Sequence, residues 1–160
     1  MTPIHSFSLA KHDGPYESWP LKTRLLLDQQ STHVEIAGYV IEGQYRCPNG
    51  FLLITSYDCP FEEISELILL TSDLCIAAHE TLGAPYESYL LNAHWAIDDR
   101  ALRLHYNDRL FYTLTIRESK LRSPALVLER DEAPERDPRS AASIDNLSQR
   151  LAAIDAAQKR

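Results

Sequence analysis

Short apolar runs separated by turn residues fill this chain from Leu21 to Ile116. The runs are rich in β-branched, leucine and aromatic residues, which favour strands, and the Asn, Asp and Gly residues between them suit hairpin turns. We expect strands at residues 21–27, 33–46, 51–57, 64–71, 74–80, 88–97, 101–106 and 109–116. The expected fold class is therefore mainly all-β, an antiparallel meander that forms a barrel or a two-layer sandwich.

Alternation along a strand predicts which side chains face the core. In segment 88–97, Ala93, Trp95 and Ile97 share one side, which excludes His94. We therefore expect Trp95 to point inward and His94 to be an ordinary residue on the other face of the sheet.

Segment 58–83 fits two structures. Asp58 and Pro60, followed by two glutamates, resemble the start of a helix, and Gly83 resembles a helix stop. A turn at residues 71–73 between two apolar runs is simpler and favours a hairpin. We expect the hairpin and leave the helical alternative open.

The composition changes after residue 128. Residues 129–139 are charged and contain two prolines, which predicts an exposed linker, and residues 140–160 place apolar side chains at helical spacing. We expect a β domain over residues 1–128, the linker, and a C-terminal amphipathic helix. The helix is too short to be stable alone, so it should dock on the body or pair with a second copy as a homodimer. Its apolar stripe comprises Ile144, Leu147, Leu151 and Ile154.

The sequence offers little support for catalysis or a cofactor. Its five glycines form no phosphate-binding loop, and no serine or cysteine has the local context of a nucleophile. Cys47, Cys59 and Cys75 are expected as free thiols in the cytoplasm, unless a secretory signal has been removed. Cys75 and His79 would meet at a metal only on a helix, because a strand places them about 13 Å apart. We expect a non-enzyme without metal or cofactor.

Charge is distributed unevenly. Between Cys47 and Asp99 there are nine acids and no lysine or arginine, whereas the other residues hold fourteen acids and sixteen bases, which together give −9 + 2 = −7. Nucleic acid is an unlikely partner for such a surface, and no apolar run is long enough for a membrane span. We expect an acidic surface that binds a basic protein, as an inhibitor or immunity-type protein does with a cationic enzyme, although acidic loops without a function fit as well. The residues expected there are Asp58, Glu62, Glu63, Glu66, Asp73 and Glu80.

Two other functions remain open. A β-barrel could enclose a small ligand, in a cavity lined by aromatic side chains. The third alternative, with the least support, is a hydrolase that uses histidine and acid pairs. The aromatic residues expected to line the cavity are Trp19, Tyr39, Tyr45, Trp95 and Tyr112.

Overall fold

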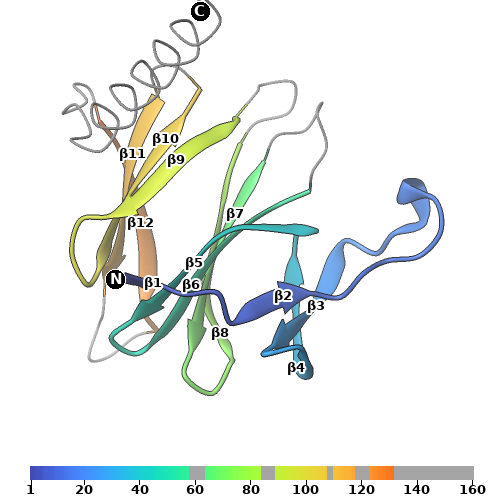
Figure 1. Ribbon diagram of the computed structural model, residues 1–160. Coiled ribbons are helices and arrows are strands. Elements are labelled where there is room, and N and C mark those ends of the chain that lie inside the picture. The colour runs from blue at the N-terminus through green and yellow to red at the C-terminus, as the bar shows by residue number, and fades with distance from the viewer. Residues whose placement is uncertain (58–63, 84–88, 108–109, 118–122, 132–160) are drawn as a thin grey trace, which may run out of the picture.

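A computed structural model describes residues 1–57, 64–83, 89–107, 110–117 and 123–131 (Figure 1). Twelve strands and one 3-10 turn, η1 (Tyr16–Ser18), make up this part of the chain. The strands are β1 (Thr2–Pro3), β2 (Phe7–Leu9), β3 (Lys22–Leu27), β4 (Gln30–Ala37), β5 (Val40–Cys47), β6 (Gly50–Ser56), β7 (Ser65–Thr71), β8 (Ile76–Leu82), β9 (Leu91–Ala96), β10 (Ala101–Tyr106), β11 (Leu110–Arg117) and β12 (Ala125–Asp131).

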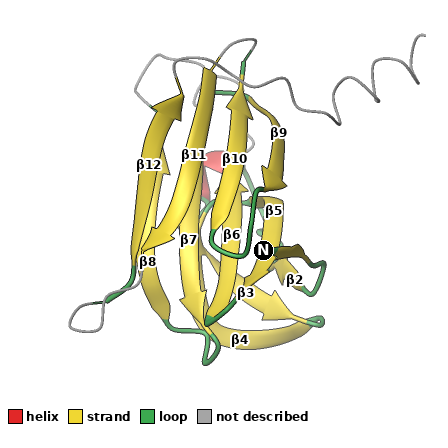
Figure 2. Ribbon diagram, turned by 90° about the vertical axis from the view of Figure 1, so that its left-hand side faces the viewer, coloured by secondary structure: helices red, strands yellow, loops and turns green. Residues whose placement is uncertain are grey.

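The strands form three antiparallel sheets arranged as layers. The central sheet has the order β1-β5-β6-β7-β8, one neighbour has the order β12-β11-β10-β9, and the smaller one has the order β2-β3-β4. Figure 1 shows the central sheet between the other two, and Figure 2 shows the β9–β12 sheet lying across its face. The mainly all-β prediction is confirmed, but the described strands form three layers and do not close into a barrel.

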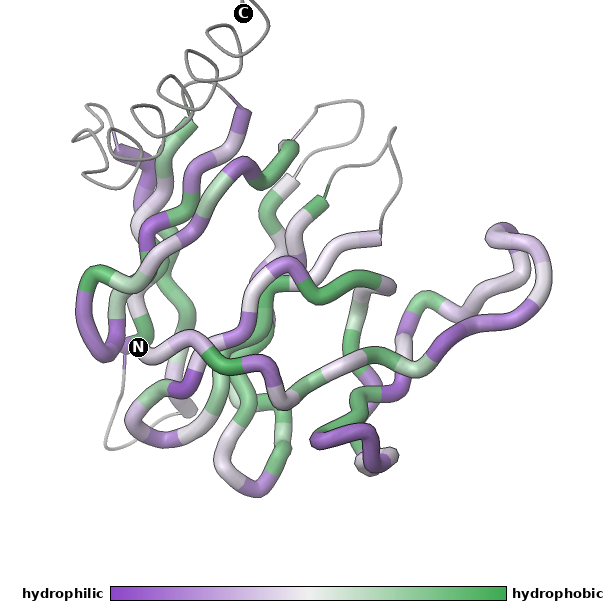
Figure 3. Tube along the Cα trace, viewed as in Figure 1, coloured by the Kyte–Doolittle hydropathy of each residue, from purple (hydrophilic) through white to green (hydrophobic). Residues whose placement is uncertain are grey.

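Two hydrophobic cores flank the central sheet because β6 and β7 are buried on both faces. Leu52 and Leu67 belong to the core shared with the β9–β12 sheet, whereas Leu53 and Ile68 belong to the core shared with β2–β4. All four have exposed fractions of 0% or 1%, and burying such a side chain stabilises the fold by about 1.5–3 kcal/mol. The apolar stretches of β6 and β7 in Figure 3 therefore pack against a sheet on each side.

The predicted strand 33–46 is two strands. Gly38 has a φ of +95°, and the backbone changes direction there between β4 and β5. The break sends β4 into the small sheet and β5 into the central one. A left-handed φ is accessible to glycine without strain, so Gly38 allows one continuous apolar pattern to be divided between two layers.

The prediction that Trp95 of β9 faces the core, with His94 on the other face, is wrong. His94 pairs with Leu104 and Ala96 pairs with Leu102, and both leucines are fully buried in the two-sheet core. His94 therefore faces the core, and Trp95, which pairs with Arg103, lies on the outer face. The sequence misled because both faces of this edge strand are half-buried, so polarity does not distinguish them.

The remaining fold predictions have mixed outcomes. β7 and β8 form the expected hairpin, so the helical alternative is wrong for residues 64–83. β12 pairs with β11 as far as Asp131, so the first three residues of the predicted linker belong to a strand. Residues 58–63 and 132–160, including the predicted C-terminal helix, lie outside the described residues.

Candidate ligand-binding site

A pocket of about 590 Å³ opens at one end of the space between the central sheet and the β9–β12 sheet. The ends of seven strands surround it, contributed by the β5–β6 and β7–β8 hairpins and by β10, β11 and β12. Its wall is mostly apolar. The lining residues are Cys47, Pro48, Asn49, Gly50, Leu69, Leu70, Thr71, Ala77, Arg100, Ile116 and Pro124.

Gly50 positions one side of the pocket. The two-residue turn of Pro48 and Asn49 pairs Cys47 with Gly50. Gly50 then passes so close to β7 that a Cβ there would lie 1.9 Å from the carbonyl oxygen of Leu70. Only glycine permits this approach, so β6 and β7 stay in register up to the rim of the pocket.

Hydrogen bonds within the turns fix two further parts of the rim. The hydroxyl of Thr71 accepts the Cys75 N–H at 3.0 Å, which closes the β7–β8 turn. Asp98 Oδ1 accepts the backbone N–H groups of Arg100 and Ala101, each at 2.7 Å, which closes the β9–β10 turn. The Arg100 N–H, followed by that of Ala101, lowers the pKa of the Asp98 carboxyl. The acid at this turn therefore has a structural role.

Cys47 and Arg100 bring different chemistry to the pocket. Burial is the main reason that the pKa of the Cys47 thiol rises to about 11, so the thiol is neutral at pH 7. Arg100 is exposed at the rim and is the one charged side chain among the described lining residues. An apolar wall with one cation at its edge suits a ligand that is mainly apolar.

A second pocket, of about 430 Å³, lies at the seam between β1 and β9. His94 bridges this seam: Nε2–H donates to the Glu42 carbonyl oxygen at 3.0 Å, and Nδ1 forms a hydrogen bond of 2.5 Å with the Tyr45 hydroxyl. A carbonyl oxygen can only accept, so Nε2 carries a proton in this contact. The polar groups here already bond to one another, so this pocket is the weaker candidate.

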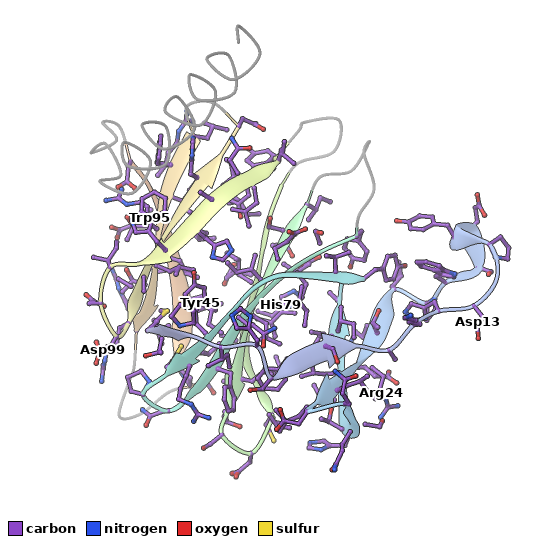
Figure 4. All side chains as sticks on the ribbon, viewed as in Figure 1. Asp13, Arg24, Tyr45, His79, Trp95 and Asp99 are labelled. Carbon is purple, nitrogen blue, oxygen red and sulfur yellow. The ribbon has the colours of Figure 1, made fainter. Side chains whose placement is uncertain are left out.

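The five aromatic residues predicted to line one cavity do not meet. Tyr45 and Trp95 border the seam pocket, from opposite sides of β9 (Figure 4), and Tyr112 packs against Tyr106. Trp19 and Tyr39 lie together with ring centroids 5.2 Å apart. None of the five lines the 590 Å³ pocket, and the structure does not bring them together around one cavity.

Tyr39 is the centre of a separate aromatic cluster. Its ring meets those of His12, Tyr16, Trp19 and Tyr57 at centroid distances of 5.2–5.6 Å, all close to edge-on. Edge-on contacts between aromatic rings are a favourable packing arrangement. This cluster attaches the segment around η1 to the body.

Glu66 was predicted on an exposed acidic surface, and the structure buries it. Only 6% of the residue is exposed. The Thr81 hydroxyl and His79 Nε2 both donate to its Oε2 at 2.7 Å, and the Tyr57 hydroxyl lies 3.5 Å from Oε1. Glu66 is therefore a buried acceptor that joins β7 to β8 and has no access to a partner protein.

The other predicted acidic residues are separated. Asp73 lies in the β7–β8 turn and Glu80 lies far along β8, and both are exposed. Asp58, Glu62 and Glu63 lie outside the described residues. Among the described residues, then, the acids do not form the single cluster that the sequence suggested.

His79 and Cys75 do not form a metal site. β8 begins at Ile76, so Cys75 is in the turn and His79 is well along the strand, bonded to Glu66. No group of three or more His, Cys, Asp or Glu side chains among the described residues is placed to hold a metal ion.

Comparisons with protein-family models, with curated proteins and with solved structures found no match. Within the described residues, no helix has the length and apolar character needed to cross a membrane. The pocket and its chemistry therefore carry the functional argument.

Sequence reasoning missed the pocket because its residues come from several distant strand ends. The sequence marks Cys47 only as an expected free thiol, and it does not single out Arg100. A clue was present in Arg100 itself, a cation that directly follows two acids in a tight turn between apolar strands.

Proposed function

We propose that this is a non-catalytic binding protein that holds a small, largely apolar ligand at the open end of its two-sheet body. The observation that carries the proposal is the pocket of about 590 Å³ between the two sheets. Ligand sites in proteins have volumes of about 300–1,000 Å³, have mostly apolar walls, and often lie at the mouths of β structures. The pocket has each of these properties.

The surroundings of His79, His94 and Cys47 favour a binding function over a catalytic one. His79 is bonded to Glu66 and His94 to Tyr45, each in a contact between strands, and neither lines the larger pocket. Cys47 does line it, but its thiol is neutral and so is a poor nucleophile. The pocket offers a shape and an apolar surface to its ligand.

The test is a titration with N-phenyl-1-naphthylamine, a neutral dye that fluoresces in apolar surroundings. We expect saturable binding to the wild-type protein. Ala77→Trp should abolish it because the indole would fill the pocket, whereas Ile76→Trp is the matched control, on the same strand but outside the lining. Equal binding by both variants, or fluorescence that never saturates, would contradict the proposal.

A second candidate is recognition of a basic protein. It is favoured by the absence of lysine and arginine between Cys47 and Asp99, a span in which Asp73 and Glu80 are exposed. Charge reversal of both residues to lysine should then release a partner captured from native lysate. Raised salt should release the same partner, because exposed charges are screened over about 8 Å at physiological ionic strength. A partner retained in both experiments would exclude this surface.

A further inference from the structure

We infer that the outer edge of β8 binds an extended, basic segment of a partner protein by strand addition, with Glu80 opposite a lysine or arginine of that segment. The inference does not depend on the 590 Å³ pocket. It gives the second candidate function, recognition of a basic protein, a specific surface and a binding mode.

β8 is the last strand of the central sheet. The order β1-β5-β6-β7-β8 leaves one side of β8 without a neighbouring strand among the described residues. From Ala78 to Leu82, β8 pairs with β7 without a register shift. Along such a stretch, alternate residues direct their N–H and C=O groups away from the strand that they pair with. An extended chain can therefore form backbone hydrogen bonds with this edge.

The edge of β8 lacks the features that usually prevent strand addition. Natural edge strands often carry a lysine, a proline or a bulge that blocks pairing with another chain. β8 contains no lysine or proline, and its one register shift lies before Ala78. His79, Glu80 and Thr81 are exposed. In the described part of the chain, the regular stretch of this edge is thus open to an added strand.

β4, an edge strand of the small sheet, is irregular by comparison. Its register with β3 shifts between Arg24 and Leu26. The backbone N–H of Val34 donates to Thr32 Oγ1 at 3.1 Å, so this donor is already used within the strand. An irregular edge of this kind is a poor template for a second strand.

Hydrogen bonds to β7 hold the open edge of β8 in its extended form. The Thr81 hydroxyl and His79 Nε2 each lie 2.7 Å from Oε2 of Glu66, which is only 6% exposed. Both β8 side chains are therefore fixed on the same face of the hairpin. A surface that is already ordered loses less conformational entropy when a partner binds.

Glu80 gives this edge its charge. It pairs with Leu67 in the β7–β8 register, and its exposed carboxylate forms no hydrogen bond or ion pair with another described residue. The span from Cys47 to Asp99 has no lysine or arginine, so β6, β7 and β8 bring no such cation beside it. Opposite charges directly across a strand pair stabilise the pair, and like charges destabilise it. A basic residue is the favoured neighbour of Glu80.

The residues around Glu80 define the rest of the partner sequence. Ala78 and Leu82 lie two positions from Glu80, on the same face, and pack against the two-sheet core. We therefore expect an apolar residue two positions before and two positions after the basic residue of the partner. A second copy of this chain fits less well, because it would bring two acidic spans together.

The first test is a titration of the full chain with the labelled peptide Val-Thr-Lys-Thr-Val, followed by fluorescence anisotropy. We expect it to bind about tenfold more tightly than the same peptide with glutamate in place of lysine. Val-Pro-Lys-Pro-Val keeps the charge but lacks two backbone N–H groups, and should also bind about tenfold more weakly. If the proline peptide binds as tightly, or if the lysine peptide does not bind, the inference is wrong.

Hydrogen exchange locates the bound peptide. At saturation, alternate backbone amides from Ala78 to Leu82 should exchange about tenfold more slowly, whereas those of β4 should not change. Unchanged exchange in β8 would overturn the inference. Protection of β8 without peptide that grows with protein concentration would also overturn it, because a second copy would then occupy the edge.

Two charge reversals complete the test. Glu80→Lys should reverse the preference, so that the glutamate peptide binds more tightly than the lysine peptide. Asp73→Lys is the matched control, because it makes the same change of charge in the β7–β8 turn, outside the strand, and should keep the wild-type preference. A lysine preference retained by Glu80→Lys would contradict the inference. None of these failures would affect the dye titration that tests the pocket.

Discussion

Gly43 lies against the ring of His94: a Cβ on residue 43 would be 2.7 Å from His94 Cε1. The missing side chain leaves space for the imidazole to reach the Glu42 carbonyl oxygen and the Tyr45 hydroxyl. The described residues of β5 and β9 form no backbone ladder, so the side chain of His94 makes this contact between the two sheets. A side chain, and not main-chain hydrogen bonding, thus connects β9 to β5.

Gly43→Ala should destabilise the fold because the added methyl group displaces the His94 ring. Overpacking of this kind costs about 1–3 kcal/mol, which urea unfolding would measure. The cost should shrink sharply in a His94→Ala background, where the ring is absent. Strictly additive effects of the two substitutions would contradict the contact.

Glu66→Ala should be more harmful than Glu80→Ala on the same hairpin. Glu66 is buried and accepts bonds from Thr81 and His79, whereas Glu80 is exposed. Removing a buried acceptor leaves its donors unpaired and lowers the stability of the fold by about 1–3 kcal/mol. Substitutions at exposed positions change stability little. Thermal unfolding of the two variants measures the difference, and equal melting temperatures would mean that Glu66 is not a buried acceptor.

Cys47 and Cys75 should differ in reactivity. At pH 8 a thiol with a pKa of about 11 is ionised to about one part in a thousand, and only the thiolate reacts. Cys75 is exposed and should react with iodoacetamide first. Mass spectrometry of a Cys59→Ser variant would follow both sites. Faster labelling of Cys47 would show that its thiol is not buried as described.

Tyr106→Phe should leave stability at pH 7 unchanged or raise it. The Tyr106 side chain is fully buried, and its hydroxyl makes no hydrogen bond of ordinary geometry among the described residues, although the Ser65 hydroxyl is near enough to lower the pKa of the phenol. An unpaired buried hydroxyl costs free energy that phenylalanine avoids. A loss of more than about 1 kcal/mol in urea unfolding would reveal a partner such as a bound water.

Tyr106→Phe should also change how the stability of the fold depends on pH in alkaline solution. Burial raises the pKa of Tyr106 from 10.0 to about 12, so folding favours the neutral phenol. This contribution is complete below pH 10 and is lost as the pH rises towards 12. Tyr106→Phe should therefore lose less stability over that interval than the wild type, and identical profiles would contradict the assignment. Tyr57, whose pKa is also about 12, would retain its own share of the loss.

The sequence predicts strand positions well because local propensity and turn chemistry determine them. Asp28 and Gln29 both have a positive φ in the β3–β4 turn, and Asp98 closes the β9–β10 turn. Asp is a residue type that favours such turns. The layers were harder to predict. β6 and β7 lack alternation, and this pattern, typical of strands buried on both faces, was the available sign of a third layer.

The candidate site was beyond the reach of sequence patterns. Leu69, Ala77 and Ile116 lie on three different strands, and Arg100 lies in the β9–β10 turn. Only the pairing of the strands brings these residues together. The charge pattern pointed instead to Glu66, which folding buries. A count of acids along the chain does not reveal which of them a hairpin turns inward.

The most direct test of the ligand site is an NMR titration of the full, ¹⁵N-labelled chain with decanol, an uncharged and largely apolar molecule. The account predicts that saturable shifts concentrate at Leu69, Ala77, Arg100 and Ile116, around the 590 Å³ pocket. Shifts centred on Tyr45, His94 and the Trp95 indole at the seam, or no saturable shifts at all, would contradict it.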